Sequence, residues 1–200
     1  MQDCILASAS PRRREILERL GLKPEIVVTD ADERTDETNP ERLSEELSVR
    51  KGRAALELLA KRGTALAGKL LIASDTTVFC DGQILGKPRD AADARRMLSL
   101  LSGRRHEVVS GIWLSLDGTE AVSHAVTAVT FAPLGEREIE AYIASGEPFG
   151  KAGAYAVQGL AASFIRGIDG DYFNVVGLPV NRMCELYRSV FGGELVLRGE

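Results

Sequence analysis

The sequence predicts an α/β fold in which a single mixed β-sheet is flanked by helices. Apolar runs of strand length alternate with segments of helical periodicity along the whole chain, and Asp-Gly pairs join neighbouring runs into at least two antiparallel hairpins. A chain of 200 residues has the usual length of one domain. We therefore expect one domain over residues 1–200, elongated and with a cleft between two lobes, any second lobe being an insertion into the first.

Local signals place the elements of the first half of the chain. Residues 4–7 form a short apolar run typical of a strand, and Ser10-Pro11 starts a helix that Gly21 ends. Residues 25–28 can form a second strand. A polar loop follows over residues 29–38, and Asn39-Pro40 then opens a longer helix that extends to about residue 62.

The second half contains the hairpins. Residues 70–75 have the pattern of a buried strand, and the runs within residues 78–85 surround Asp81-Gly82, a strong hairpin signal. Asp90 can cap the next helix, which Gly103 closes. The further elements predicted are strands 106–116 and 119–131 joined by Asp117-Gly118, helix 136–145, strand 163–168 and helix 179–191.

Composition excludes several classes of protein. The 25 basic and 29 acidic residues give a net charge of −4 without a long basic stripe, so we expect no nucleic-acid or anionic-membrane partner. No apolar run approaches the ~18 residues of a membrane span, and the N-terminus lacks the order of a signal peptide. Three widely spaced cysteines, Cys4, Cys80 and Cys184, favour neither a disulfide framework nor a zinc site. The expected location is the cytoplasm.

The segment with the sequence SASPRRR, residues 8–14, contradicts the usual preference of a helix start. Three arginines stand in the first turn, where the helix dipole favours carboxylates. A bound anion reverses that preference, because backbone N–H groups, the Ser8 hydroxyl and forked guanidiniums such as that of Arg13 all suit phosphate. A solvated basic face is the alternative.

Two carboxylates are candidate metal ligands or bases. Asp75 follows the most apolar early strand, and ligands of open α/β sheets bind beyond the carboxyl ends of strands. A carboxylate there can hold Mg²⁺ or accept a proton from water. Glu33, in the acidic loop, is the second candidate. The alternatives are a turn-forming role for Asp75 and a solvated position for Glu33.

Two lysines resemble residues that reach phosphate groups. Lys87 lies in Gly-Lys-Pro after a hairpin strand, and Lys151 lies in the glycine-rich segment FGKAGAY. Neither belongs to a P-loop, because three rather than four residues separate Gly146 from Gly150 and Ala152 replaces the Ser or Thr. A surface charge is the alternative for each.

The two histidines are assigned a structural role. His106 and His124 lie in strand-like runs without a partner at metal or base spacing.

Taken together, the motifs resemble the Maf family. They occur in the family's order over about residues 4–190, and a set of motifs is far more specific than any one of them. The matching motifs are Ser8-x-Ser10-Pro11-Arg12-Arg13, Asp32-Glu33, Lys51, Ser74-Asp75-Thr76, Gly86-Lys87-Pro88, Lys151-Ala152-Gly153-Ala154-Tyr155-x-x-Gln158-Gly159 and Asn174-Val175-Val176-Gly177-Leu178-Pro179.

The resemblance implies a fold of the Maf and ITPase type and a metal-dependent nucleoside triphosphate pyrophosphatase, which cleaves between the α- and β-phosphates. The motif set looks like the branch that acts on dTTP and UTP. By resemblance, Asp75 is the proton acceptor, and Arg12, Thr76 and Gln158 select the base. The basic groups Arg13, Lys51, Lys87 and Lys151 can neutralise the phosphates, while Mg²⁺ or Mn²⁺ is held by Glu33 and Asp75. Family members are commonly homodimers.

Three other functions compete with this interpretation. They are a pyrophosphatase for 7-methyl-GTP, a non-catalytic nucleotide-binding regulator of cell division, and a phosphatase that releases orthophosphate. One departure from the family pattern is Gly52, which follows Lys51 where alanine is more usual. We expect it to weaken the helix slightly without touching the chemistry.

Overall fold

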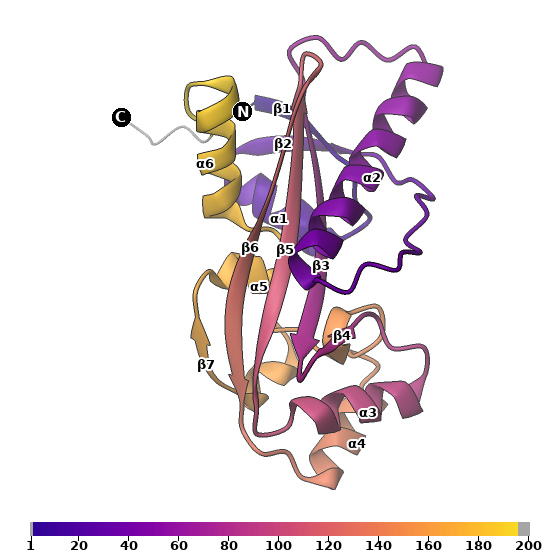
Figure 1. The fold of residues 1–200 in the computed structure, drawn as a ribbon, viewed down its shortest axis with the longest axis vertical. Coiled ribbons are helices and arrows are strands. Elements are labelled where there is room, and N and C mark those ends of the chain that lie inside the picture. The colour runs from indigo at the N-terminus through magenta and orange to yellow at the C-terminus, as the bar shows by residue number, and fades with distance from the viewer. Residues whose placement is uncertain (1, 196–200) are drawn as a thin grey trace. The chain divides into compact units, whose positions relative to one another are not determined.

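The computed structural model describes residues 2–195, together with their side chains except that of Gln2. Figure 1 shows its helices and strands. In chain order these are β1 (Gln2–Leu6), α1 (Pro11–Arg19), β2 (Leu22–Ile26), α2 (Pro40–Lys61), β3 (Leu70–Cys80), β4 (Gln83–Leu85), α3 (Ala91–Leu101), β5 (Arg105–Leu116), β6 (Thr119–Phe131), α4 (Glu136–Ala144), the 3₁₀ helices η1 (Ala152–Ala154) and η2 (Leu160–Phe164), β7 (Ile165–Asp169), α5 (Tyr172–Val176) and α6 (Val180–Phe191).

The strands form one mixed sheet of seven strands in the order β2-β1-β3-β5-β6-β7, with β4 paired to β3. β1 pairs in parallel with both β2 and β3, whereas β4 on β3 and β7 on β6 are antiparallel. Helices flank this sheet, so the predicted α/β class is confirmed.

The chain divides into two compact units. The first comprises residues 1–75, 110–125 and 177–200, and the second comprises residues 76–109 and 126–176. In sequence, both segments of the second unit lie between segments of the first, and β3, β5 and β6 contribute residues to both. The predicted elongation and cleft concern the placement of the units and stay predictions.

In the first unit, a core cluster joins the sheet to α2. Ile5 of β1 and Leu71 of β3 are almost completely buried against Ala55 and Leu59 of α2 and against Trp113 of β5. In the view of Figure 1, α2 lies in front of these strands and α1 behind them. The strands are therefore covered on both faces, as their continuous apolar sequence requires.

The second unit has its own core, built from α3, α4 and parts of β3 to β6. Leu98, Leu101 and Phe131 are fully buried in it, together with the aromatic side chains of Tyr142 and Tyr155. Phe131 packs edge-on against Tyr155, with 4.9 Å between ring centroids. Such edge-to-face pairs add to the stabilisation from burial alone.

The short-range signals form as predicted. The Asn39 side chain accepts a hydrogen bond from the backbone N–H of Arg42, and Asp90 caps α3 through the N–H of Asp93. Both residues of Asp81-Gly82 have positive φ, as do both of Asp117-Gly118. A pair of positive φ angles is what a two-residue type I′ hairpin turn needs.

Several elements differ from the prediction. β1 covers residues 2–6 rather than 4–7, and β3 is one strand over residues 70–80, so that the predicted strand 70–75 continues into the first run of the hairpin. β2 covers residues 22–26 rather than 25–28, because it pairs in register with β1 from Leu22 onward and its edge position tolerates Pro24. β7 covers residues 165–169 rather than 163–168, because the chain forms η2 up to Phe164. The short helix α5 was not predicted, because no signal in the sequence indicated it.

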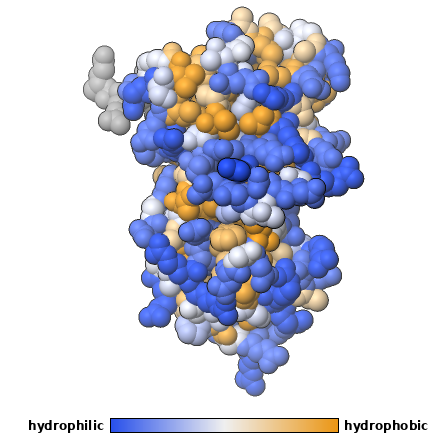
Figure 2. All heavy atoms as spheres, viewed as in Figure 1, coloured by the Kyte–Doolittle hydropathy of each residue, from blue (hydrophilic) through white to orange (hydrophobic). Residues whose placement is uncertain are grey.

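The visible surface in Figure 2 is largely hydrophilic, with hydrophobic residues in scattered patches. Within residues 2–195, no helix is both long and apolar enough to cross a membrane.

Candidate functional site

Six of the predicted site residues belong to the first unit and come from four parts of the chain. Ser8 follows β1, Arg12 and Arg13 lie in the first turn of α1, Glu33 lies in the loop before α2, Lys51 lies within α2, and Asp75 lies within β3. Hydrogen bonds and ion pairs link five of them into the two groups described next.

The first group is centred on Lys51. Its ammonium forms an ion pair with an oxygen of Asp75 and lies 2.9 Å from Oε1 of Glu33. The side chains of Lys51 and Asp75 are only 16% and 14% exposed, whereas Glu33 is 48% exposed. Two carboxylates therefore converge on one positive charge in a half-buried place, where an unpaired charge would be costly.

The second group is centred on Arg13. Its Nε donates to the carbonyl oxygen of Gly177 at 2.7 Å, and its Nη1 donates to Oγ of Ser8 at 3.0 Å. Ser74, next to Asp75 in β3, donates its hydroxyl to the same Gly177 oxygen at 3.2 Å. The Gly177 carbonyl thus holds the start of α1 beside β3.

Charge links the two groups. Burial lowers the pKa of the Arg13 guanidinium, whereas the negative charge of Asp75 raises it and the neighbouring Arg12 lowers it. Glu33 acts in the same direction as Asp75. The carboxylates therefore stabilise two cations, the guanidinium and the ammonium, in one region of the first unit.

The predicted cap of α1 differs in detail. Ser10 occupies the N-cap position, but its side chain makes no capping hydrogen bond. Its backbone N–H instead donates to Oγ of Ser8 at 3.2 Å. Ser8 therefore accepts from both Ser10 and Arg13, which fixes the loop that the sequence assigned to phosphate.

The second unit holds the other predicted residues, Thr76, Lys87, Lys151 and Gln158. The backbone N–H of Gly153 donates to the carbonyl of Gly86 at 3.0 Å, so the loops that carry Lys87 and Lys151 are joined. Gly153 has φ +66°, and a Cβ there would lie 2.9 Å from Val78. Only glycine suits this close contact.

The histidines have the structural role predicted for them. His106 is 2% exposed, and its Nε2 lies 2.9 Å from the hydroxyl of Tyr155. Burial lowers the pKa of His106 to about 4, so the ring is neutral at physiological pH. The Nδ1 of His124 lies 2.8 Å from Glu45, a partner from α2 that sequence spacing did not reveal.

The carboxylates of Glu33 and Asp75 are oxygen donors of the kind that a divalent cation takes. Among residues 2–195, no group of three or more His, Cys, Asp or Glu side chains is arranged to hold a metal ion. The carboxylates of Glu33 and Asp75 nevertheless both form ion pairs with the Lys51 ammonium, so the two lie near one position that a cation occupies. Mg²⁺ usually takes one or two carboxylates and completes its coordination with water and substrate phosphates.

Two features of the first unit escaped the sequence prediction. Gly177 belongs to one of the motifs that match the family pattern, but nothing in that motif shows that its carbonyl accepts hydrogen bonds from Arg13 and Ser74. Gly52 lies against the ring of Trp113, so it is more than a weak point in α2. A methyl group at this position would lie 2.6 Å from Cδ2 of Trp113.

Comparison with known proteins gives consistent matches over nearly the whole chain. The family model described as Maf-like protein matches residues 3–190. Proteins named dTTP/UTP pyrophosphatase are 44% identical over 187 residues in Symbiobacterium thermophilum and 47% identical over 195 residues in Moorella thermoacetica. These matches cover 93% and 96% of this chain, and the same shares of the relatives.

A third relative of the same name, from Ruminiclostridium cellulolyticum, is 45% identical and covers 95% of this chain and 97% of its own. Among solved structures, that of the Staphylococcus aureus Ham1 protein is similar at 16% identity with a TM-score of 0.49, covering 91% of this chain and 96% of that chain.

Proposed function

The chain belongs to the Maf family, and from this premise we propose that it is a nucleoside triphosphate pyrophosphatase that hydrolyses dTTP and UTP. The products are the nucleoside monophosphate and pyrophosphate. The observation that carries the proposal is the set of near-full-length relatives of that name at 44–47% identity. The charged cluster of the first unit supplies the chemistry that such a reaction needs.

Asp75 is proposed as the proton acceptor. Hydrolysis of a phosphoanhydride needs a water molecule that is oriented and loses a proton as it attacks phosphorus. The Asp75 carboxylate is 14% exposed and forms an ion pair with the Lys51 ammonium, so its oxygens are held in place. From there, one of them is proposed to accept the proton of the attacking water.

The basic residues are proposed to neutralise the triphosphate, which carries about four negative charges. Arg13 is fixed by Ser8 and Gly177, so its guanidinium is positioned before a substrate arrives. Lys51 belongs to the same cluster, and Lys87 and Lys151 lie on joined loops of the second unit. Preorganised cations stabilise developing charge without reorganisation during the reaction.

Glu33 and Asp75 are the residues that would hold a divalent cation, Mg²⁺ or Mn²⁺. Such an ion, when bound with substrate, polarises phosphate oxygens. Arg12, Thr76 and Gln158 are proposed to select the base; the amide of Gln158 offers both a donor and an acceptor, as a pyrimidine edge requires. A cytoplasmic location and a homodimeric state complete the proposal.

The decisive experiment is incubation of the purified protein with Mg²⁺ or Mn²⁺ and a panel of canonical and modified triphosphates. The products to resolve are monophosphate, diphosphate, pyrophosphate and orthophosphate. We expect pyrophosphate together with dTMP or UMP. Orthophosphate with a diphosphate would identify a phosphatase, preference for 7-methyl-GTP would identify the other branch, and binding without turnover would identify a regulator.

The matched variants are Asp75→Asn and Asp117→Asn. Both exchange one carboxylate oxygen for an amide, but Asp117 lies in the exposed β5–β6 turn and accepts from the N–H of Gly68. We expect turnover to fall by at least about 10²-fold in Asp75→Asn, the usual size of a general-base contribution, and to stay unchanged in Asp117→Asn. Full activity of Asp75→Asn would remove this carboxylate from the mechanism.

A further inference from the structure

Glu147 lies between α4 and the glycine-rich loop, and no role follows for it from the chemistry described above. It is half-buried, although a glutamate in a loop is usually solvated. Its carboxylate accepts hydrogen bonds from three groups of the second unit. They are the hydroxyl of Tyr142 at 2.8 Å, the backbone N–H of Leu160 at 3.0 Å and that of Ala161 at 3.4 Å.

Tyr142 extends this network to the preceding residues of the loop. Its hydroxyl donates to Glu147 and accepts from the backbone N–H of Ala156 at 3.2 Å. Tyr142 is 3% exposed and packs edge-on against Phe164, with 5.1 Å between ring centroids, so the hydroxyl is fixed in place. The pair of Tyr142 and Glu147 therefore binds residue 156 on one side and residue 160 on the other.

Gln158 lies between those two anchored positions. The N–H of Gly159 donates to the carbonyl of Ala156 at 3.0 Å, which closes a tight turn with Gln158 inside it. Ala156 and Val157 are 8% exposed each, whereas Gln158 is exposed. The turn is thus anchored at its base and presents one amide side chain outward.

The turn is built directly on the Glu147 carboxylate. A Cβ placed on Gly159 would overlap the carboxyl group of Glu147, so this carboxylate lies directly against the backbone of Gly159. Hydrogen bonds to an ionised acceptor are roughly twice as strong as neutral ones. A neutral replacement at residue 147 would therefore hold the turn less firmly.

We propose that Glu147 is a positioning residue for base selection, which fixes the turn that presents Gln158 to the substrate. The inference rests on the proposed function and deepens it. In this proposal Glu147 fixes the position of the Gln158 amide, which contacts the base, without contacting the base itself. A glutamine amide discriminates between bases only if its donor and acceptor stand at fixed positions, and a misplacement of about 1 Å can cost 10²-fold in rate.

The charge state of Glu147 agrees with this role. Burial on its own raises the pKa of Glu147, but the hydrogen bonds from Leu160, Tyr142 and Ala161 outweigh it and hold the pKa below its usual value. The positive charge of Lys151 acts in the same direction. The carboxylate is therefore ionised at neutral pH and accepts its three hydrogen bonds as a charged group.

The test compares kcat/KM for dTTP and UTP with kcat/KM for purine triphosphates in Glu147→Ala, Glu147→Gln and Tyr142→Phe. We expect Glu147→Ala to lower the ratio of kcat/KM for pyrimidine triphosphates to kcat/KM for purine triphosphates by about 10- to 100-fold. Glu147→Gln should be intermediate, because an amide keeps one acceptor oxygen but replaces the other with a donor. Tyr142→Phe, which frees the N–H of Ala156, should change the ratio in the same direction.

Glu140→Ala is the matched control. Glu140 lies on α4 in the same unit and forms a bidentate ion pair with Arg95, at 2.5 and 2.7 Å, but has no hydrogen bond to the turn. It should leave the ratio unchanged. If Glu147→Ala does not fold, Glu147→Gln and Tyr142→Phe still decide the matter, because each keeps most of the packing.

A double variant separates positioning from a general structural effect. In the background of Gln158→Ala, the change Glu147→Ala should leave the substrate ratio unmoved, since the group being positioned is absent. The inference is overturned if Glu147→Ala lowers the substrate ratio in that background by the same factor as in the wild type. It is also overturned if Glu147→Ala lowers the melting temperature but leaves the ratio unchanged. Neither result would affect the proposed pyrophosphatase activity. A wild-type protein inactive on every triphosphate overturns the proposed function and, with it, this inference.

Discussion

Gly52 is predicted to be indispensable to the packing of α2, and the change Gly52→Ala tests this directly. A methyl group at this position would lie 2.6 Å from Cδ2 of Trp113 and nearer still to two other ring carbons. Carbon atoms in ordinary contact are about 3.5–4.0 Å apart. The overlap is about 0.9–1.4 Å at its mildest point, so either the ring or the helix has to move.

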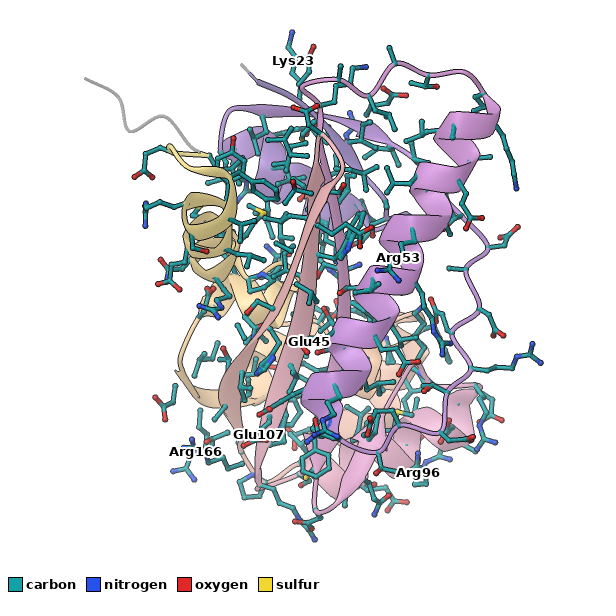
Figure 3. The ribbon with its side chains drawn as sticks, turned by 45° about the horizontal axis from the view of Figure 1, so that its top comes forward. Lys23, Glu45, Arg53, Arg96, Glu107 and Arg166 are labelled. Atoms are coloured by element: carbon teal, nitrogen blue, oxygen red, sulfur yellow. The ribbon has the colours of Figure 1, made fainter. Side chains whose placement is uncertain are left out.

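The ring of Trp113 has little freedom to move. It is 1% exposed, and its Nε1 donates to Oε2 of Glu120 at 3.1 Å. Glu120 also accepts a hydrogen bond from Arg53, which projects from α2 (Figure 3). The distance from Nε of Arg53 to Oε2 of Glu120 is 3.1 Å. The helix would therefore shift, and Lys51, the residue before Gly52, would shift with it relative to Asp75.

The expected magnitude is the difference between two opposing effects. Inserting carbon atoms into a packed core costs about 1–3 kcal/mol. Replacing glycine by alanine within a helix stabilises it by about 1 kcal/mol. The severe overlap places the cost in the upper part of its range, about 2–3 kcal/mol, so we expect a net loss of about 1–2 kcal/mol in the free energy of unfolding. Such a loss lowers Tm by about 2–4 °C per kcal/mol for a chain of this size.

Thermal and urea denaturation measure this loss, and two other glycines serve as references. Gly167 in β7 has no atom within 4 Å of an added Cβ, so Gly167→Ala should be neutral or slightly stabilising. A Cβ on Gly111 would lie 2.7 Å from the backbone nitrogen of Glu45 and closer to the carbonyl of Ser44, so Gly111→Ala should lose more than Gly52→Ala. A Gly52→Ala protein as stable as the wild type would refute the packing argument.

Two further predictions concern buried titratable groups. His106, with a pKa of about 4 in the fold against about 6.5 unfolded, contributes stability that is complete above pH 6.5 and is lost as pH falls toward 4, by up to about 3 kcal/mol. Urea titrations from pH 7 to 4 should show this decline in the wild type and a flatter curve in His106→Gln; parallel curves would contradict the assignment. Cys184 should be the first thiol alkylated by iodoacetamide in the native protein, because Cys4 and Cys80 are 2% exposed and burial raises the pKa of both. Mass spectrometry of the peptides identifies the modified residue, and early labelling of Cys4 would contradict the structure.

Elements governed by short-range rules could be predicted from the sequence. The caps at Asn39 and Asp90 depend on hydrogen bonds to a backbone N–H three residues further on, and the turn at Asp117-Gly118 depends on the positive φ angles of its own two residues. The register of β2 could not be predicted in this way, because pairing with β1 fixes it. Apolar content alone favoured residues 25–28, and the pairing admits Pro24 because β2 is an edge strand.

The site shows the same division. Motif order indicated Asp75, Lys51 and Arg13 as candidates, yet the contact of Lys51 with Asp75 joins residues 24 positions apart and that of Arg13 with Gly177 joins residues 164 positions apart. No spacing rule indicates that the carbonyl of Gly177 accepts a hydrogen bond from Arg13, because every residue has a backbone oxygen and its presence carries no signal in the sequence. The effect of Gly52 was missed for a related reason: its fit depends on Trp113, a partner on a distant strand.

The charge balance of the first unit explains how its ionised side chains coexist in a half-buried place before substrate binds. Glu33 and Asp75 share the Lys51 ammonium, and the nearby Arg13 is stabilised by both carboxylates. Two negative and two positive groups therefore offset one another, which limits the cost of removing them from water. Under the proposed function, a triphosphate would add about four negative charges and so favour a divalent cation at the carboxylates over the ammonium alone. On that proposal, a cluster whose charges offset one another in the free protein would become a phosphate-binding cluster when substrate and metal bind.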